Sequence, residues 1–259
     1  MEVLKAKGPL PMLTIDDKTG DLTALAFGDR ALVVAPCMYF NNHRWIENDR
    51  FGDTSNKLAD VATVTRTADS IVVERDGERC SERITYTYGK GFVEANVTLT
   101  PKNDHVRRAG VVLYLDTIYN NVSYYALGPW ENYNDRHDGC LTGHYTTTVR
   151  QMLTPYIKPQ SCGGREALRE VTFTDSAGHG VKVETEGDVS FSAIPYTDEQ
   201  LMRAAHQWEL PASDRIVVHF NAAYRGLGNA SCGADVDTLP QYRVQPKAYH
   251  FKLRFTPIR

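Results

Sequence analysis

The fold is decided by the stretch Val93-Glu94-Ala95-Asn96-Val97-Thr98-Leu99, in which apolar and polar side chains alternate. Alternation with a period of two is typical of a strand that turns one face to a core and the other to solvent. Similar runs at residues 71–75, 84–88 and 110–115 surround it, separated by turn sequences such as Asp76-Gly77 and Gly89-Lys90-Gly91. Together these runs predict an antiparallel meander.

Five more runs extend the pattern toward the end of the chain, at residues 170–174, 181–185, 189–193, 216–222 and 249–256. Only residues 198–210 have a helical pattern, with Thr197 as the N-cap and Pro211 after the end. One short helix among at least nine strands excludes a doubly wound sheet and a (β/α)₈ barrel. We therefore predict an all-β sandwich. Because no Pro/Gly/Ser-rich linker or internal repeat interrupts it, we predict a single domain over residues 1–259.

The composition excludes several classes of protein. The chain has 259 residues, 42% of them hydrophobic, which is enough for a large core. Its formal net charge of −3 offers no basic surface to nucleic acid, and no run approaches the ~18 apolar residues of a membrane span. We expect neither nucleic acid nor a membrane as partner. The first residues carry no secretory signal, which leaves a cytoplasmic or a periplasmic compartment open if the source is a bacterium.

The five cysteines are scattered and odd in number, which predicts free thiols. They are Cys37, Cys80, Cys140, Cys162 and Cys232. No Cys or His pair has the spacing of metal ligands, so we predict no metal or cofactor within this chain.

Two segments break the alternation, residues 36–56 and 127–165, and we expect both to be long loops that carry binding. Both segments combine aromatic residues with amide, carboxylate and guanidinium groups, a combination typical of sugar-binding sites. An aromatic ring stacks on the C–H face of a sugar, and the polar groups form hydrogen bonds with its hydroxyls. The same groups can equally satisfy one another and the loop backbone. The residues of interest are Arg44, Trp45, Glu47, Asn48 and Asp49 in the first segment and Trp130, Glu131, Asn132, Tyr133, Asp135 and Arg136 in the second.

Carboxyl pairs for glycoside hydrolysis can be proposed, Glu47 with Asp49 or Glu131 with Asp135. Ion pairs of Arg136 with Glu131 or Asp135 explain the second pair at least as well. For His219, inside a predicted strand, a structural role is the commoner one. We therefore assign no catalytic residue from these patterns.

The second segment resembles a known family in its ordered motifs. These are Gly128-Pro129-Trp130-Glu131-Asn132-Tyr133-Asn134-Asp135-Arg136 and Pro155-Tyr156-Ile157-Lys158-Pro159-Gln160. Together with Phe40-Asn41-Asn42-His43-Arg44-Trp45-Ile46-Glu47-Asn48-Asp49 and Gly226-Leu227-Gly228-Asn229-Ala230-Ser231-Cys232-Gly233, they are similar to the C-terminal, small-chain domain of the bacterial β-galactosidases of glycoside hydrolase family 2. The resemblance spans nearly the whole chain.

This resemblance implies a large antiparallel β-supersandwich with a galactose mutarotase-like fold. It also implies an incomplete enzyme, because the family's catalytic glutamates lie on an upstream (β/α)₈ barrel and Mg²⁺ or Na⁺ belongs to the full-length protein. The family's late loop, which reaches the sugar, corresponds to residues 225–235. Here Cys232 stands near the place of a family tryptophan, and this difference puts aglycone stacking in doubt.

The leading hypothesis is therefore the C-terminal domain of a retaining β-galactosidase acting on terminal β-D-galactosides, inactive alone, with a galactoside and the upstream barrel as partners. We expect Arg44, Trp45, Glu47, Asn48, Asp49 and Cys232 near the substrate rim, and the motif from Trp130 to Arg136 to be mainly architectural. Two alternatives stay open. One is a free-standing aldose 1-epimerase using a pair such as Glu47 and His43, and the other is a non-catalytic carbohydrate-binding module.

Overall fold

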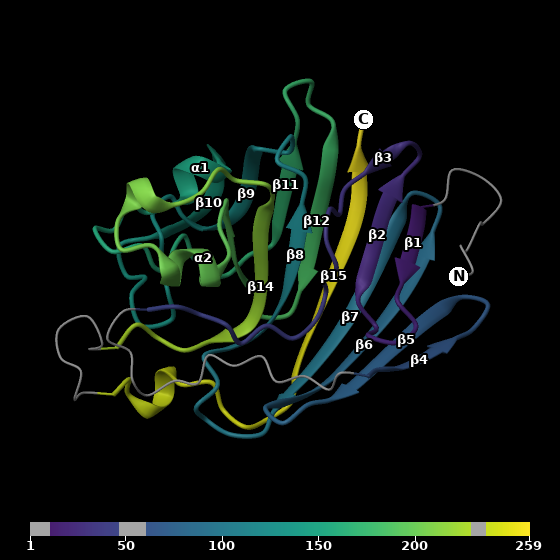
Figure 1. Cartoon of the computed structure of the whole chain (residues 1–259), viewed down its shortest axis with the longest axis horizontal. Coiled ribbons are helices and arrows are strands. Elements are labelled where there is room, and N and C mark those ends of the chain that lie inside the picture. Colours follow the sequence, from purple (N-terminus) through teal and green to yellow (C-terminus); the bar gives the residue numbers. More distant parts are fainter. Residues whose placement is uncertain (1–10, 47–60, 229–236) are drawn as a thin grey trace.

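The computed structural model describes residues 11–46, 61–228 and 237–259. Within them the chain forms three antiparallel sheets and little helix (Figure 1). The largest sheet has nine strands in the order β10-β9-β11-β12-β15-β7-β6-β5-β4. Two three-stranded sheets, β13-β14-β8 and β1-β2-β3, accompany it.

The strand bounds are as follows. The first half contains β1 (Pro11–Ile15), β2 (Leu22–Phe27), β3 (Arg30–Ala31), β4 (Thr63–Arg66), β5 (Ser70–Asp76), β6 (Cys80–Gly89), β7 (Phe92–Pro101) and β8 (Arg108–Leu115). The second half contains β9 (Asn121–Gly128), β10 (Leu141–Thr148), β11 (Glu170–Thr174), β12 (Gly180–Glu186), β13 (Ser190–Ile194), β14 (Ile216–Tyr224) and β15 (Tyr249–Ile258). All nine predicted strands are present, and the predicted all-β sandwich is confirmed.

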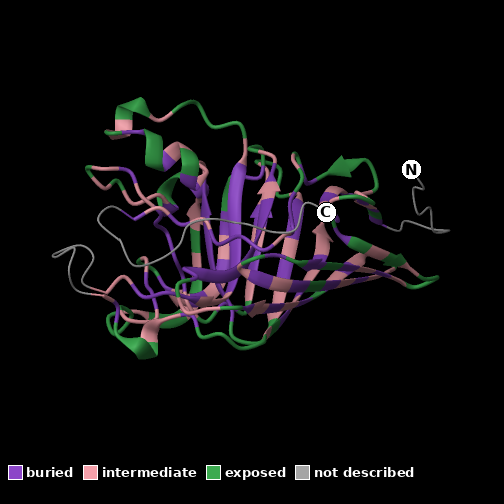
Figure 2. Ribbon diagram, turned by 60° about the horizontal axis from the view of Figure 1, so that its bottom comes forward, coloured by how far each residue is buried: buried purple, intermediate pink, exposed green. Residues whose placement is uncertain are grey.

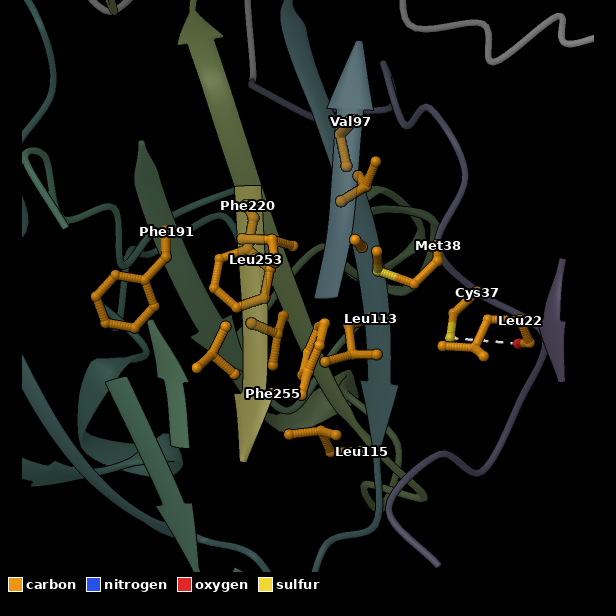
Figure 3. Close-up of a cluster of buried hydrophobic side chains, with 14 of the residues drawn as sticks. Leu22, Cys37, Met38, Val97, Leu113, Leu115, Phe191, Phe220, Leu253 and Phe255 are labelled. Atoms are coloured by element: carbon orange, nitrogen blue, oxygen red, sulfur yellow. Dashed lines mark hydrogen bonds between the residues drawn. The ribbon is translucent and has the colours of Figure 1, made fainter. Parts of the chain in front are cut away.

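The core lies between the large sheet and the two small ones. Leu253 and Phe255 of β15 meet Phe220 of β14 there, and Leu113 of β8 joins the same cluster (Figure 3). In β14, Ile216, Val218 and Phe220 belong to this core, whereas Val217, His219 and Asn221 point to the outer face of the small sheet. Figure 2 shows the buried strands at the centre of the molecule and exposed residues along its edges. That outer face is the floor of the site described below.

The helical prediction was incomplete. Thr197 caps α2 (Asp198–Arg203) through a capping box with Gln200, but the helix ends at Arg203 because Ala204 is extended, and a separate 3₁₀ turn, η1 (Gln207–Glu209), follows. Two further turns lie elsewhere, α1 (Val149–Met152) and η2 (Pro240–Tyr242). Figure 1 shows α1 and α2 on the side of the molecule opposite β1 and β2.

The prediction of one long loop over residues 127–165 was wrong in part, because β10 and α1 lie inside it. β10 is an edge strand that pairs only with β9 and reads Leu-Thr-Gly-His-Tyr-Thr-Thr-Thr, with no fully buried position. An edge strand without a buried face carries no apolar alternation, so the period-two pattern does not reveal it.

Candidate functional site

The two predicted loops pack against each other at one end of the sandwich. Ser161 of the second loop donates its backbone N–H to the Trp45 carbonyl of the first, at 2.7 Å. The guanidinium of Arg44 lies 5.7 Å from the ring centroid of Tyr133. Within the second loop, Gly164 permits the close approach of the Tyr133 ring, since a Cβ there would lie 2.7 Å from it. The two segments therefore form one assembly rather than two separate loops.

At its centre lie two arginines and two tyrosines, Arg44, Arg108, Tyr133 and Tyr224, here called the arginine–tyrosine cluster. The two tyrosine rings are stacked, with centroids 5.5 Å apart and planes 10° from parallel. The Arg44 Cζ is 3.8 Å from the Tyr224 centroid, and the Arg108 Cζ is 5.2 Å from the same ring. A desolvated guanidinium over an aromatic face is stabilised by about 2 kcal/mol. Stacking, rather than ion pairing, holds Arg44 in place.

The cluster is buried but not satisfied. Arg44 is 0% exposed and Arg108 is 1% exposed. Arg44 donates through Nη1 to the carbonyl of Arg225. Its Nε and Nη2, and Nε and Nη1 of Arg108, have no hydrogen-bond partner among residues 11–46, 61–228 and 237–259. A buried donor without an acceptor costs about 1–3 kcal/mol, more when charged. Such groups call for an explanation other than the stability of this chain.

Asp198 is the carboxylate nearest to Arg108, with its Oδ2 3.5 Å from Nη2. It also accepts the Trp45 N–H at 3.0 Å and the hydroxyl of Ser161, so it joins both loops to the start of α2. His219 Nε2 lies 3.7 Å from the same carboxylate. Burial, together with the charge of Arg108, lowers the pKa of His219 well below its usual value. His219 is therefore neutral at pH 7.

Glu131 joins several parts of the second loop. Its carboxylate accepts Arg136 Nη2 at 2.7 Å, the hydroxyls of Tyr156 and Thr154, and the Gly163 N–H at 2.9 Å. Burial works against ionisation, but these donors outweigh it and lower the pKa of Glu131. A carboxylate occupied in this way has little capacity left for a ligand.

Asn132 and Asp135 fasten the motif to neighbouring chain. The fully buried Asn132 amide donates to the carbonyls of Leu127 and Trp130 and accepts the Glu166 N–H at 2.8 Å. Asp135 accepts the N–H groups of Leu227 at 3.0 Å and Gly228 at 2.7 Å.

The base of the late loop, predicted over residues 225–235, is closed by a further ion pair between Arg225 and Asp237. The carboxylate of Asp135 binds the same base through the N–H groups of Leu227 and Gly228. The second motif therefore anchors the late loop.

The remaining predicted residues divide into two groups. Trp130 is 72% exposed, and the Trp45 indole N–H is buried without a partner. Glu47, Asn48, Asp49 and Cys232 lie outside the described residues. His43 contacts Glu199 of α2, with Nδ1 2.6 Å from Oε1. Among the described cysteines, Cys37, Cys80, Cys140 and Cys162 are free.

A polar cleft of about 420 Å³ lies beside the cluster and was not predicted. Tyr224, Asn134, Ser190, Arg243 and Glu166 are among its lining residues. The Glu166 carboxylate has no hydrogen bond or ion pair to any described residue. Burial raises the pKa of Glu166 to about 7, although the charge of Arg44 opposes the shift. A carboxyl group that titrates near neutral pH in a cleft is suited to acid–base work.

Sequence reasoning also missed Arg108, Asp198 and Tyr224. Asp198 lies in the first turn of α2 and Tyr224 at the end of β14, places that the secondary structure explains, so no local signal marks either as part of a site. A charged residue at the first, buried position of a strand, as Arg108 is in β8, is the one signal that could have found it.

Among the described residues, no group of three or more His, Cys, Asp or Glu side chains is arranged to hold a metal ion. None of the helices in this part of the chain is long and apolar enough to cross a membrane.

Known proteins resemble the chain in sequence. Residues 9–255 match the family model of the beta galactosidase small chain. A β-galactosidase of Priestia megaterium is 30% identical over 162 residues, which cover 61% of this chain but only 16% of the relative. The β-galactosidase BgaC of Bifidobacterium adolescentis is 28% identical over 236 residues, covering 81% of the chain and 22% of the relative. The chain thus spans a minor part of these relatives' length.

Solved structures resemble it in fold. The galactose 1-epimerase of Lactobacillus acidophilus has a TM-score of 0.58 at 8% identity, covering 99% of this chain and 93% of that one. A galactose mutarotase-like protein from Lactobacillus casei has a TM-score of 0.54 at 7% identity, covering 99% and 100%. At such identities the likeness shows a galactose mutarotase-like fold alone. The family-model match over residues 9–255 establishes that this chain belongs to the beta galactosidase small-chain family.

Proposed function

We propose that this chain is the C-terminal part of a glycoside hydrolase family 2 β-galactosidase that hydrolyses terminal β-D-galactosides with retention. The catalytic glutamates lie on an upstream barrel, and this chain completes the enzyme and lines the rim of its active site. Family membership and the small share of the relatives' length that the chain covers support this division of labour.

One observation carries the assignment of the rim. The first loop, the second motif and the base of the late loop converge on the arginine–tyrosine cluster, although they lie far apart in the sequence. The cluster holds buried guanidinium donors that no described residue of this chain satisfies. A partner that brings acceptors, such as another domain of the same enzyme or a sugar bound between the two, would satisfy them.

The test compares the 259-residue chain with the native full-length gene product on a chromogenic β-galactoside. We expect turnover by the full-length protein with the β-anomer as first product, and none by the chain alone, which has no retaining carboxyl pair assigned to it. Clear turnover by the pure chain would contradict the proposal. A native gene product no larger than this chain would contradict it as well.

A second candidate function, aldose 1-epimerisation, is favoured by one specific feature. Glu166 offers an unpartnered carboxyl with a pKa of about 7 beside a cleft wide enough for one sugar ring. The pair suggested by the sequence, Glu47 with His43, has less support, because His43 contacts Glu199. Polarimetry on α-galactose decides between the two functions. A rate above buffer that disappears in Glu166→Gln would favour epimerisation, and an unchanged buffer rate would exclude it.

A further inference from the structure

A second groove lies away from the arginine–tyrosine cluster and has a volume of about 480 Å³. It runs between α1, the end of β13 and η1, so its walls come from three separate parts of the chain. Its floor and sides include the apolar residues Val149, Pro195, Leu210, Pro211 and Ile216. Its size falls in the range of small-molecule sites, roughly 300–1,000 Å³.

An exposed tryptophan borders this groove. Trp208 is 78% exposed, yet its indole is stacked on the His206 ring, with centroids 4.2 Å apart and planes 9° from parallel. His206 is fixed in turn by Glu209, whose Oε1 lies 2.9 Å from Nδ1. The imidazole of His206 covers one face of the Trp208 indole. Because Trp208 lines the groove and His206 does not, the groove borders another side of the indole ring. The ring is thus held in place while it stays open to a ligand.

Polar groups around this ring are available for hydrogen bonds. Tyr196, Arg150 and Asn120 are among the residues that line the groove, and none of their side chains has a hydrogen bond or ion pair with another described residue. The lining contains one cation and no carboxylate, which disfavours a cationic ligand. An apolar floor, a fixed aromatic ring and free donors match the surface of a pyranose, which has C–H faces and a rim of hydroxyls.

We propose that this groove is a second carbohydrate-binding site, in which a neutral pyranose stacks on Trp208 and takes hydrogen bonds from Tyr196 and Arg150. None of the described residues assigned to the rim lines the groove, although Trp45 packs on the same small hydrophobic cluster as Tyr196 and Leu210. Binding there does not depend on the activity of the full-length enzyme. Its ligand is held by one stacking face and a few solvent-exposed hydrogen bonds, so we expect a dissociation constant on the order of 1–10 mM.

The test uses ¹⁹F NMR of the 259-residue chain labelled with 5-fluorotryptophan. The chain has 3 tryptophans, so the spectrum has one resonance for each, assigned by Trp→Phe variants. The probe is methyl β-D-thiogalactoside, whose C–S bond resists hydrolysis, so that the result is independent of the proposed β-galactosidase function. We expect the Trp208 resonance to shift and saturate while those of Trp45 and Trp130 stay in place.

Variants of the groove sharpen the result. Tyr196→Phe and Arg150→Ala each remove one hydrogen bond and should raise the dissociation constant about 5- to 10-fold. Arg169→Ala, which removes an exposed arginine outside the groove, is the matched control and should leave it unchanged. The sugar-free spectrum of each variant checks that it is folded. A Trp208 resonance that never moves overturns the proposal, as does a shift whose affinity is the same in Tyr196→Phe, Arg150→Ala and the control.

Discussion

Two buried arginines of this molecule have opposite environments. Arg75 on β5 is 4% exposed, and its guanidinium donates to Asp21 at 2.8 Å, to the Thr19 carbonyl at 2.7 Å and to Glu82. Arg44 is 0% exposed, stacks on Tyr224 and, among the described residues, its guanidinium has one hydrogen bond, to a backbone carbonyl.

A buried charge that is fully paired contributes to the stability of the folded chain, because removing one partner leaves the other buried charges uncompensated. A buried charge that is not fully paired adds little stability. The difference shows that Arg75 is part of the ion-pair network of this chain, and it supports the proposal that Arg44 serves a partner that binds at the cluster.

The largest expected effect is at the paired arginine. Arg75→Met leaves the carboxylate of Glu82, which is 3% exposed, without its ion-pair partner. We expect the free energy of unfolding to fall by about 3–5 kcal/mol. Urea denaturation followed by circular dichroism measures this loss. A fall in the free energy of unfolding of less than about 1 kcal/mol would contradict the idea that Arg75, unlike Arg44, stabilises the chain through its ion pairs.

The cleft beside the cluster gives a pH-dependent effect of intermediate size. Glu166 has a folded-state pKa of about 7 against an ordinary value of 4.5, so the folded state retains its proton longer than the unfolded state does. Its contribution to stability is therefore complete below about pH 4.5 and is lost as the pH rises through 7.

Glu166→Gln tests this directly, because glutamine has no charge to bury. The variant should be about 2 kcal/mol more stable than the wild type at pH 8 and equal to it at pH 4. Asp138→Asn, which changes an exposed carboxylate, is the control and should show no pH-dependent gain in the free energy of unfolding. Equal free energies of unfolding for wild type and Glu166→Gln at both pH values would mean that Glu166 is not desolvated.

The smallest effect on stability is expected at the unsatisfied arginine. Arg44→Met keeps an apolar chain against Tyr224 and removes a charge with two unsatisfied donors. The lost cation–π contact and the relieved desolvation nearly cancel, so the loss should be no more than about 1 kcal/mol. Because this is the substitution made at Arg75, urea denaturation of the two variants side by side isolates the effect of pairing.

The sequence predicted nine of the strands in which apolar and polar side chains alternate. The β7 stretch and its neighbours alternate, because one face of each strand enters the core, and every strand predicted in this way exists. β10 lacks a buried face and was missed, and β9 was missed although every second residue of it is buried. The helix after Thr197 was located but made too long, because its break at Ala204 carries no Gly or Pro.

The site was less predictable than the fold, because its residues come from segments that lie far apart in the sequence. Arg44 and Tyr133 were singled out by motif, yet the contacts of both with Tyr224 depend on how distant segments pack. The same holds for the stacking of Arg108 on Tyr224. Glu166 lies just outside the predicted loop of residues 127–165, and its raised pKa comes from burial that no local pattern encodes.

The central claim is that the arginine–tyrosine cluster serves the intact enzyme and not the stability of this chain. The most direct test is kcat/KM of the full-length gene product on a chromogenic β-galactoside, measured for wild type and Arg44→Met. Because misplaced rim groups cost catalysis strongly, we predict a fall of about 10- to 100-fold in kcat/KM with an unfolding transition of this chain close to that of the wild type. An unchanged kcat/KM, or a loss of activity explained entirely by unfolding, would contradict the claim.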